Sequence, residues 1–557
     1  MPRIYANKQT ALIGEYFQAA QARLKDGSKS TEDVFDSVSQ DNSVQMPVVL
    51  DELLGKLDGF GQDVFDSVIH GMKIYHDAHG CNAPADVIEQ ALHNAFASQK
   101  ALADLNICLG DRLDSASESH MNAYSLQPNR AIVSIMSAMA EAIPFAGYFP
   151  ADIRSNEAKA LILHNRAKSP WGGYAIDGAI DGVFNGEPYM MPNRLIALST
   201  SNQTAYTGTA RAQYESGSRT VVDGASAGLK LMAGRTQILV NGFSCARDMK
   251  GPGLGGTTAI TGQTVIGVTA YTITGTVNND TGAIALTFSP ALPNNTSVVA
   301  EVIADFERDP DKIPSFGFEV ESHSYFAAGH RALTELTIDS QSQVRNEMNL
   351  DPASNSLFSL RTQLTNEQHY YALQLGYLIS GNNTLVHDFN LAAQFAAKNI
   401  SEIFADVEQT LFVLDQNMIN DTLDHGITHL YVKGLLGGII AALPRTIFEP
   451  SGVPTRAGIY RLGRLFNKYE VYYTPKIVAE NAANGTSSML CIGRSNDVGR
   501  SPIVMGDAVP PTFIPLATNS NLVMKQAFYQ RSFLQLNKHM ASAKGFARID
   551  FINLPNH

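Results

Sequence analysis

The chain has 557 residues, of which 44% are hydrophobic and 17% are charged. This length is sufficient for several domains, and the composition excludes intrinsic disorder and a collagen-like chain. The formal net charge is −12 and the basic residues form no stripe, which excludes a protein that binds nucleic acid mainly through its charge. A charged fraction below the roughly 25% usual for globular domains is typical of a subunit that buries large surfaces against its neighbours.

The cysteines and the N-terminus indicate the compartment. The four cysteines lie far apart and form no C-x-x-C pair: Cys81, Cys108, Cys245 and Cys491. We therefore expect neither a disulfide framework nor a zinc site, and a reducing compartment. The first residues lack the apolar segment of a signal peptide. The best membrane candidate, Ala131–Ala151, contains Glu141 and two prolines, so we do not expect it to span a bilayer.

The first part of the chain is predicted to be helical. Apolar residues recur three and four positions apart in segments such as Val48–Leu57, Asp63–Tyr75 and Pro84–Leu102. Residues 1–124 are therefore expected to form an α-rich N-terminal region. A further apolar helix is predicted at Arg130–Ala142.

A strand and a long loop are predicted next. Glu157–Arg166 reads as a strand, and it leads into the glycine-rich segment Ser169–Tyr174. Trp171 is the only tryptophan of the chain, and glycines flank it in this loop. A solvent-facing tryptophan is expected to be covered by another surface, so we expect this loop to lie on a partner. The alternative is that Trp171 packs within its own subunit.

A change of composition marks the next segment, which is rich in Thr, Val, Ser, Gly and Asn. Short alternating runs separated by turn residues predict an all-β segment over about 195–308. Its clearest part is a meander of three strands, predicted at Thr264–Val277, Ala283–Phe288 and Ser297–Phe306. We expect one small β module.

A long helix is predicted at Asp351–Ile379. Asp351 supplies an N-cap, Pro352 follows at the first helical position, and Gly381 ends the helix. The apolar residues fall on a single stripe, which we expect to be buried. The residues of this stripe are Leu357, Leu360, Leu364, Tyr371, Leu375 and Leu378.

The remaining chain is predicted to be α+β. A helix is expected at Leu391–Val413, followed by strands at His429–Val432, Tyr469–Thr474 and Met489–Ile492.

One sequence motif resembles a nucleotide site. Gly251, Gly253 and Gly256 satisfy G-x-G-x-x-G, which binds a pyrophosphate when the third glycine opens a helix. Here strand-like sequence, Thr257–Gly262, follows, which favours a flexible loop. A nucleotide-binding enzyme that uses Gly251–Gly256 remains an alternative of a different class.

Two histidine pairs have the spacing of metal ligands. His425 and His429 are expected to be structural, because Gly426 and β-branched residues favour a turn into a strand. His76 and His79 lie on a predicted helix without an apparent third ligand and are expected to be solvated. The sequence predicts no catalytic, cofactor-binding or metal-binding residue and no enzymatic activity.

The order of these elements, together with several local patterns, resembles the major capsid protein of tailed bacteriophages with the Hong Kong 97-like fold, of the large myophage type. The matching segments are His330–Asp339 with Asn349–Asp351, Tyr460–Tyr472 with Pro475, Met489–Arg494 with Ser501–Val504, and Val509–Pro511. The first resembles the passage from the returning strand into the spine helix of that family. The others resemble the family's strand, glycine and proline pattern in the last third of the chain.

The resemblance implies an α+β fold in six segments. These are an α-rich N-terminal region or arm (1–124), the start of the peripheral domain with the extended loop (125–194), an inserted β-rich domain (195–308), the returning strand and spine helix (309–390), the axial domain (391–510) and a C-terminal peripheral or axial segment (511–557). The N-terminal segment of this family can be an arm or a scaffolding domain that a protease removes. The spine-helix core would then be formed by Leu357, Leu360, Leu364, Leu375 and Leu378.

The resemblance also implies a structural function without cofactors. The chain would assemble into hexamers and pentamers of an icosahedral shell around double-stranded DNA, in a virion assembled in the bacterial cytoplasm. Lys168, Trp171, Gly172 and Gly173 would lie on a neighbouring subunit. Scaffold, portal and decoration proteins are possible partners. An encapsulin-like nanocompartment shares the fold and is the alternative, although its subunit is much shorter.

Overall fold

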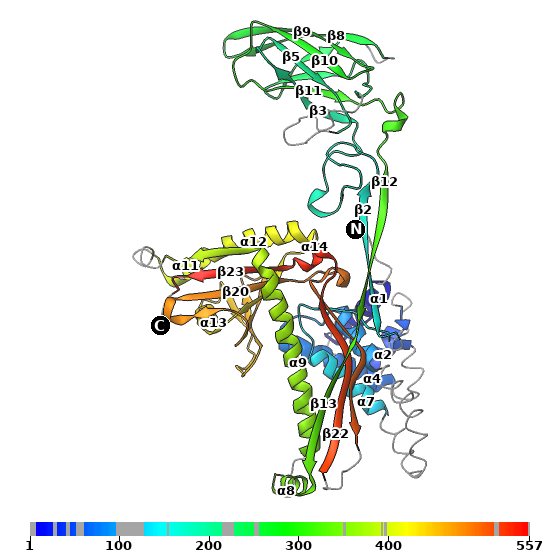
Figure 1. Ribbon diagram of the computed structural model, residues 1–557, viewed down its shortest axis with the longest axis vertical. Coiled ribbons are helices and arrows are strands. Elements are labelled where there is room, and N and C mark those ends of the chain that lie inside the picture. Colours follow the sequence, from blue (N-terminus) through cyan, green and yellow to red (C-terminus); the bar gives the residue numbers. More distant parts are fainter. Residues whose placement is uncertain are drawn as a thin grey trace. The chain divides into compact units, whose positions relative to one another are not determined.

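The computed structural model describes residues 7–25, 31–39, 45–48, 50–51, 61–95, 127–152, 155–213, 228–249, 255–348, 352–390, 394, 398–516 and 523–554. The chain divides into two compact units (Figure 1). Unit 1 comprises Met1–Ile162 and Glu321–His557, and unit 2 comprises Leu163–Val320. The chain leaves unit 1 within strand β2 (Glu157–Ala167) and returns within strand β12 (Phe316–Phe326). The predicted strand at Glu157–Arg166 is thereby confirmed.

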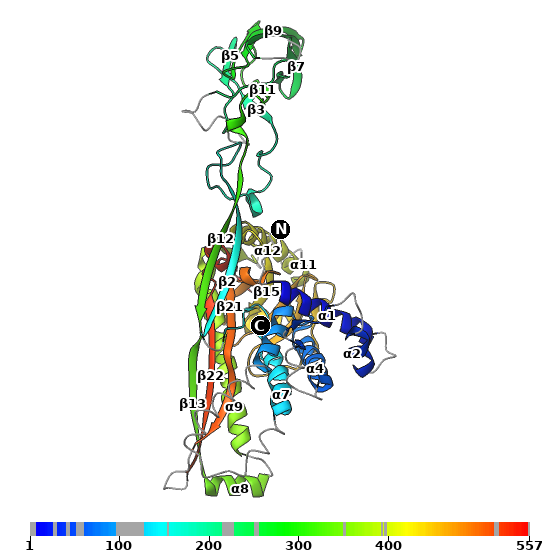
Figure 2. The same ribbon diagram turned by 90° about the vertical axis from the view of Figure 1, so that its right-hand side faces the viewer.

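The N-terminal part of unit 1 is helical, as predicted. Figure 2 shows its helices gathered on one side of strands β21 (Ile503–Pro515), β22 (Val523–Leu536) and β13 (Ala328–Thr337). The helices are α1 (Asn7–Lys25), α2 (Thr31–Ser39), α4 (Gly61–His79), residues 85–95 and α7 (Gln127–Ala140). Most of the predicted helix Val48–Leu57, and the end of Pro84–Leu102, lie outside the described residues.

The N-terminal helices share a hydrophobic core with the C-terminal half of the chain. Their aromatic residues are buried, and the rings of Phe17 and Phe65 stack with centroids 6.0 Å apart. The same core contains Tyr431, Tyr472 and Leu490. Burial of such side chains contributes roughly 1.5–3 kcal/mol each. The helical region is therefore part of unit 1 and not a separately packed domain.

A four-stranded sheet lies beside these helices. Its order is β1-β21-β22-β13, where β1 is Gly147–Tyr148 and pairs in parallel with β21. Strands β13 and β22 are antiparallel, with register from Ala328 opposite Ser532 to Thr337 opposite Val523. After β13 the chain enters α8 (Ile338–Met348) and then α9 (Pro352–Ile379).

The predicted helix at Asp351–Ile379 is confirmed as α9, but the predicted buried stripe is wrong. Leu378 is 77% exposed and Tyr371 is also exposed. The other described leucines of the stripe, Leu360, Leu364 and Leu375, are half-buried. The side chain of Leu357 lies outside the described residues.

The most buried described residues of α9 lie beside the stripe instead, and two of the three are small. Ala372, Leu373 and Gly376 are buried there. A Cβ on Gly376 would lie 2.5 Å from Cε1 of Phe546, in strand β23 (Phe546–Ile552). The sheet thus approaches the helix too closely for a large side chain. This close approach turns the leucine stripe partly toward solvent.

A second sheet forms the rest of unit 1, in the order β14-β23-β20-β15-β18-β17-β16. Its strands are β14 (Thr384–Asp388), β15 (Ile427–Val432), β16 (Phe448–Pro450), β17 (Tyr460–Leu465), β18 (Tyr469–Tyr473), β20 (Thr486–Gly493) and β23, with β19 (Glu480–Asn481) paired to β20. The three predicted strands of this region are confirmed as β15, β18 and β20.

The helices of this region differ from the prediction. In place of one helix at Leu391–Val413, α11 spans Ile400–Ala405 and α12 spans Val407–Thr422. A capping box formed by Asn399 and Glu402 starts α11. Residues 391–393 and 395–397 lie outside the described residues. Two short helices follow, α13 (Gly434–Ala441) and α14 (Met540–Ala543).

Unit 2 contains a nine-stranded sheet in the order β3-β11-β6-β7-β8-β9-β10-β5-β4 (Figure 1). Its strands are β3 (Asn193–Ala197), β4 (Ser199–Thr200), β5 (Ala205–Thr209), β6 (Gln237–Val240), β7 (Phe243–Asp248), β8 (Thr257–Ile266), β9 (Thr269–Asn278), β10 (Ala283–Ser289) and β11 (Val298–Ile303). In β10, Ile284, Leu286 and Phe288 are buried and the residues between them are exposed. This alternation is the pattern that the sequence predicts.

One predicted strand of unit 2 is two strands. The segment Thr264–Val277 reverses direction at Gly267, which has a φ of +65°, so that Ile266 pairs with Thr269. A single glycine between β-branched residues permits this tight hairpin. The strands predicted at Ala283–Phe288 and Ser297–Phe306 are confirmed as β10 and β11.

Candidate functional site

The predicted contact residues lie where β2 leads into unit 2. Lys168 is exposed, and its Nζ lies 2.7 Å from Oδ1 of the exposed Asp177. The hydrogen bond from Lys168 lowers the pKa of Asp177. The backbone N–H of Lys168 donates to the carbonyl oxygen of Ser315 at 2.8 Å, which fixes the start of the loop. Lys168 thus lies at the surface of unit 2.

The next residues form a tight turn. Trp171 and Tyr174 exchange backbone hydrogen bonds of 3.1 and 3.0 Å. Gly172 is buried with a φ of +58°, and a Cβ there would lie 1.7 Å from the carbonyl oxygen of Pro188. Position 172 therefore requires glycine, whereas Gly173 is exposed.

Trp171 lies in the core of unit 2 and is 1% exposed. Its ring centroid is 5.1 Å from that of Phe306. The guanidinium carbon of the buried Arg194 lies 4.3 Å from the ring centroid, a cation–π distance. This corrects the expected solvent-facing position of Trp171 and agrees with the alternative in which it packs within its own subunit.

Sequence reasoning missed a set of exposed apolar side chains in the same loop. These loop apolar residues are Ile176, Val183, Phe184, Met190 and Met191, and Met190 is 85% exposed. Loops carry no hydrophobic period, so periodicity could not separate them from buried residues. The available signal was the number of large apolar residues in a segment predicted to be a solvent-facing loop.

Strand β12 carries a second exposed apolar group. Phe316, Phe318 and Val320 are exposed, at alternate positions that point to one face of the strand. The two phenylalanine rings meet edge to face with centroids 5.1 Å apart. We call these three residues the β12 stripe. Scattered single apolar residues are normal at a protein surface, but grouped aromatic residues mark an interaction site.

The histidine pairs are not brought together as metal ligands. His425 lies in the turn before β15 and His429 in β15, so the predicted turn into a strand is confirmed. In α4, His76 is exposed, but His79 is partly buried and its Nδ1 lies 3.0 Å from Oη of Tyr472. The expectation that His79 is solvated is wrong, because α4 packs this end against β18.

The described end of the glycine-rich motif lacks the geometry of a nucleotide site. Gly256 precedes strand β8, and its N–H donates to Oδ2 of Asp280 at 2.7 Å. A pyrophosphate at this N–H would meet a carboxylate instead of a helix N-terminus. The predicted continuation into a strand is confirmed. Gly251 and Gly253 lie outside the described residues.

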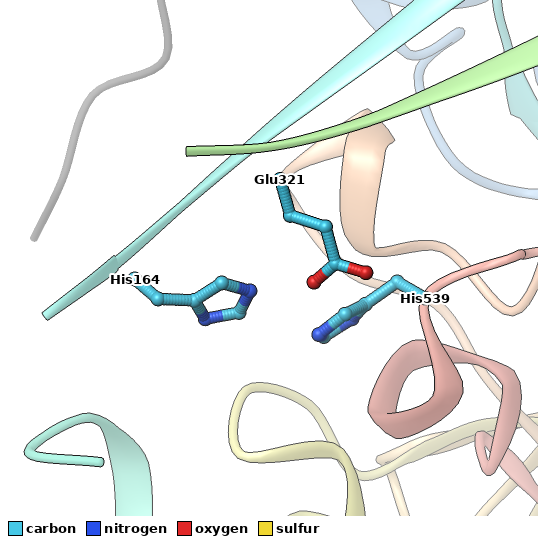
Figure 3. A group of neighbouring side chains, drawn as sticks. All are labelled: His164, Glu321 and His539. Carbon is cyan, nitrogen blue, oxygen red and sulfur yellow. The ribbon is translucent and has the colours of Figure 1, made fainter. Parts of the chain in front are cut away.

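Figure 3 shows two histidines and a glutamate, residue types that bind divalent metals. Glu321 and His539 belong to unit 1, and their ligand atoms lie within 4.8 Å of each other. Nδ1 of His539 lies 2.8 Å from Oγ of Ser542. His164 belongs to unit 2. Two ligands do not define a metal site, so Glu321 and His539 alone do not form one.

The chain was compared with known proteins. No protein-family model matches the sequence, and no curated protein matches it. Solved structures do show similarity, mostly phage capsids. The capsid of jumbo bacteriophage PhiKZ aligns with a TM-score of 0.32 and 8% identity, over 73% of this chain and 91% of that chain.

Two further structures illustrate the range of these similarities. The capsid of Myoviridae phage XM1 has a TM-score of 0.27 and 11% identity, over 59% of this chain and 93% of that chain. The holo-SrpI encapsulin complex of Synechococcus elongatus has a TM-score of 0.25 and 12% identity, over 43% of this chain and 80% of that chain. Across the ranges that the structure describes, no helix is both long and apolar enough to cross a membrane.

Proposed function

We propose that this chain is a structural protein, the major capsid subunit of a tailed bacteriophage. The observation that carries the proposal is the group of large apolar side chains exposed in unit 2, the loop apolar residues and the β12 stripe. Large apolar side chains that are exposed together, such as the edge-to-face pair Phe316 and Phe318, are rare on monomeric proteins and typical of surfaces that become buried between subunits.

The order of elements supports the finer assignment to the Hong Kong 97-like fold. The segment His330–Asp339, which resembles the family's returning strand, is mostly β13, and α8 and the 28-residue α9 follow it. Under this assignment α9 is the spine helix, residues 391–510 form the axial domain and residues 125–194 include the extended loop. The mixed sheet with β15 at its centre would be the axial-domain sheet.

Assembly follows from repetition of modest contacts. In a closed shell each subunit makes the same contacts with its neighbours, so weak interfaces add up to a stable particle. Hexamers and pentamers would be the intermediates, and double-stranded DNA would be enclosed in the virion without sequence-specific binding. We propose that Lys168, Gly173 and the loop apolar residues contact a neighbouring subunit.

The β-rich segment 195–308 has its own proposed role. Its sheet has exposed hairpin tips, with Phe243 and Val268 strongly exposed. We propose that it lies on the outer face of the shell, where it clamps neighbouring subunits or decorates the surface. Within this segment the N–H of Gly256 donates to the carboxylate of Asp280, which is a packing role.

The proposal is tested by assembly of the purified protein. Electron micrographs and light scattering should show hexamers, pentamers and shells. Met190→Asp places a charge on the proposed contact and should give folded protein that does not form shells. Met540→Asp, at a similarly exposed methionine of α14 in unit 1 to which no contact is assigned, is the matched control for the loop.

Three results distinguish the proposed loop contact from the proposed capsid function. Shells of wild type and Met540→Asp without shells of Met190→Asp support the proposed loop contact. Shells of all three proteins contradict the contact but not the capsid function. A strictly monomeric wild type at high concentration contradicts the function itself.

A further inference from the structure

Three histidines from three different elements meet inside unit 1. His79 ends α4, His369 lies in the middle of α9, and His429 lies in β15. The ring of Tyr472 has its centroid 5.9 Å from those of both His79 and His429. The ring of Phe145 lies 5.8 Å from His369 and 6.4 Å from His429. We call these three residues the histidine joint.

The polar partners of the three rings are hydroxyl groups and a backbone group. Nδ1 of His79 lies 3.0 Å from Oη of Tyr472, and the ring also has a backbone hydrogen bond at Ala142. Nε2 of His369 lies 3.1 Å from Oη of Tyr431. These partners suit neutral imidazoles, since they supply no negative charge.

The third ring has the same kind of partner. Nδ1 of His429 lies 2.7 Å from Oγ1 of Thr428. Burial lowers the pKa of His79, of His369 and of His429 to about 3 in each case. Arg494 and the other two histidines contribute to the low pKa of His429, because like charges repel.

The charged groups described around the joint are mainly guanidinium groups that already have partners. Arg494 binds both carboxylate oxygens of Asp86 at 2.8 Å. Arg461 binds Oε2 of Glu470 at 2.6 Å. The carboxylates therefore balance the guanidinium groups and leave no negative charge for an added proton.

The remaining groups described around His79 are Arg456, Tyr75 and Cys81, while the carboxylates of Asp77 and Glu449 line the solvent pocket at the end of α4. Arg456 donates to the carbonyl oxygen of Ile459 at 3.0 Å and lowers the pKa of His79. Burial raises the pKa of Tyr75 and the pKa of Cys81, so both stay protonated. Each proton taken up by the joint therefore adds a net positive charge.

Water can reach the end of α4. A pocket of about 530 Å³ opens there, and His76, Gly80, Arg461 and Arg464 are among its lining residues. The pocket brings solvent to Gly80, next to His79 in sequence, and to Arg461, one of the charged groups around His79; none of the three histidines lines it.

We propose that the histidine joint is an acid-operated latch: protonation of His79, His369 and His429 releases α4 and the helical residues 85–95 from the rest of unit 1. Of the three rings, only His79 belongs to the segment that leaves. Its departure separates it from Arg461, Arg494, His369 and His429, and it opens the remaining rings to water. The release also separates Asp86 from Arg494, and this ion pair opposes the opening until the histidines are protonated. The hydrophobic cluster around α12, β15 and β23 contains no residue of the N-terminal helices and stays folded.

The direction of the pH effect follows from linkage. The folded pKa values lie below the ordinary histidine value of about 6.5, so the latched form is fully stable above about pH 6.5 and weakens as the pH falls. Release takes up to three protons, so its equilibrium constant should rise up to about 1000-fold per pH unit between about pH 6 and 4.

Hydrogen exchange of the full chain tests the latch. Amide exchange, corrected for intrinsic pH dependence, is followed by mass spectrometry from pH 7.5 to 4.5. Peptides of α4 and residues 85–95 should lose protection at a pH where peptides of α12 and of the β8–β9 hairpin keep it. Simultaneous loss in α4 and α12 would overturn the proposal, because it would mean global unfolding.

Variants test the proton count. His79→Gln keeps a hydrogen-bonding group beside Tyr472 but cannot gain the charge, so the pH dependence should fall from about three protons to about two. His76→Gln, the exposed neighbour on the same helix, is the control and should leave it unchanged. An unchanged steepness in His79→Gln would overturn the role of His79.

A measurement on the wild type decides the matter if His79→Gln does not fold. Hydrogen exchange at the imidazole C2 position gives the pKa of each histidine separately. Values below about 5 for all three residues of the joint support the latch. Values near about 6.5, the ordinary value for histidine, would overturn it.

Discussion

A buried ion pair ties the N-terminal helices to the second sheet of unit 1. Asp86 is 3% exposed and accepts two hydrogen bonds of 2.8 Å from Arg494, which follows β20. The same carboxylate accepts from the N–H of Tyr148 at 3.0 Å. Such a pair adds little net stability compared with apolar residues, but removal of one partner leaves a buried charge.

Asp86→Asn is therefore expected to destabilise unit 1 by about 3–5 kcal/mol. The free energy of unfolding is measured by urea denaturation followed by circular dichroism. Asp406→Asn is the control, because the Lys398–Asp406 pair is exposed and should contribute about 1 kcal/mol or less. Equal effects of the two variants would show that the Asp86 site is well hydrated.

Trp171 gives a spectroscopic prediction. Because the ring is buried between Phe306 and Arg194 within unit 2, its emission should be blue-shifted and acrylamide should quench it weakly. The emission maximum should not change when capsomers form shells. A shift on assembly would mean that a neighbouring subunit contacts the ring after all.

Among the elements, helix α9 shows that a local sequence pattern predicts the bounds of a helix but not the face that is buried. The N-cap, the proline and the terminal glycine are local signals, and they correctly place the helix at Pro352–Ile379. The face of the helix that is buried depends on Phe546, about 170 residues further on, so no local pattern identifies Gly376 as the contact point. The split of Thr264–Val277 into β8 and β9 likewise depends on one glycine whose φ the sequence does not state.

The corrected face of α9 predicts unequal effects of two leucine substitutions. Leu373→Ala removes a fully buried side chain and should cost about 2–5 kcal/mol of unfolding free energy. Leu378→Ala changes an exposed side chain and should cost less than about 0.5 kcal/mol. Both are measured by chemical denaturation of the same preparation.

Two other outcomes of the comparison between Leu373→Ala and Leu378→Ala would change the role assigned to the leucine stripe. If Leu378→Ala destabilises the subunit as much as Leu373→Ala, the original leucine stripe is the buried face. If Leu378→Ala leaves the subunit stable but lowers the yield of shells, the exposed stripe of α9 is an assembly surface.

The candidate contact surface shows the same limit of sequence reasoning. Lys168 and Gly173 were predicted to be accessible and lie at the surface of unit 2, because charged and glycine-rich loop segments are rarely buried. Trp171 was placed wrongly because its burial depends on Arg194 and Phe306, which are distant in sequence. Residues such as Met190 were missed because hydrophobicity alone predicts burial.

At the scale of the whole molecule, the two units have separate hydrophobic cores. The clusters of buried residues described in unit 1 contain no residue between 163 and 320, and the cluster of unit 2 contains only such residues. Deletion of Gly255–Glu307 alone would remove β11, which pairs with both β3 and β6. The appropriate deletion is therefore the entire unit 2.

We expect the full chain to unfold in two calorimetric transitions, since separate cores need not unfold together. Replacement of Leu163–Val320 by a short Gly/Ser linker should abolish one transition and shift the midpoint of the other by no more than a few degrees. A single transition in the full chain, or loss of all soluble protein on deletion, would show that the units depend on each other for folding.

The β8–β9 hairpin has a practical consequence for particle engineering. Val268 is fully exposed beside the tight turn at Gly267, and a Cβ at that glycine would meet no atom within 4 Å. Foreign residues added to an exposed turn cost little closure entropy, since each doubling of loop length adds only about 0.6 kcal/mol. With unit 2 on the outer face of the shell, as proposed above, an antigenic peptide inserted between Gly267 and Val268 would be displayed once per subunit, at a density fixed by the lattice, which makes this turn the first position to try for a vaccine scaffold.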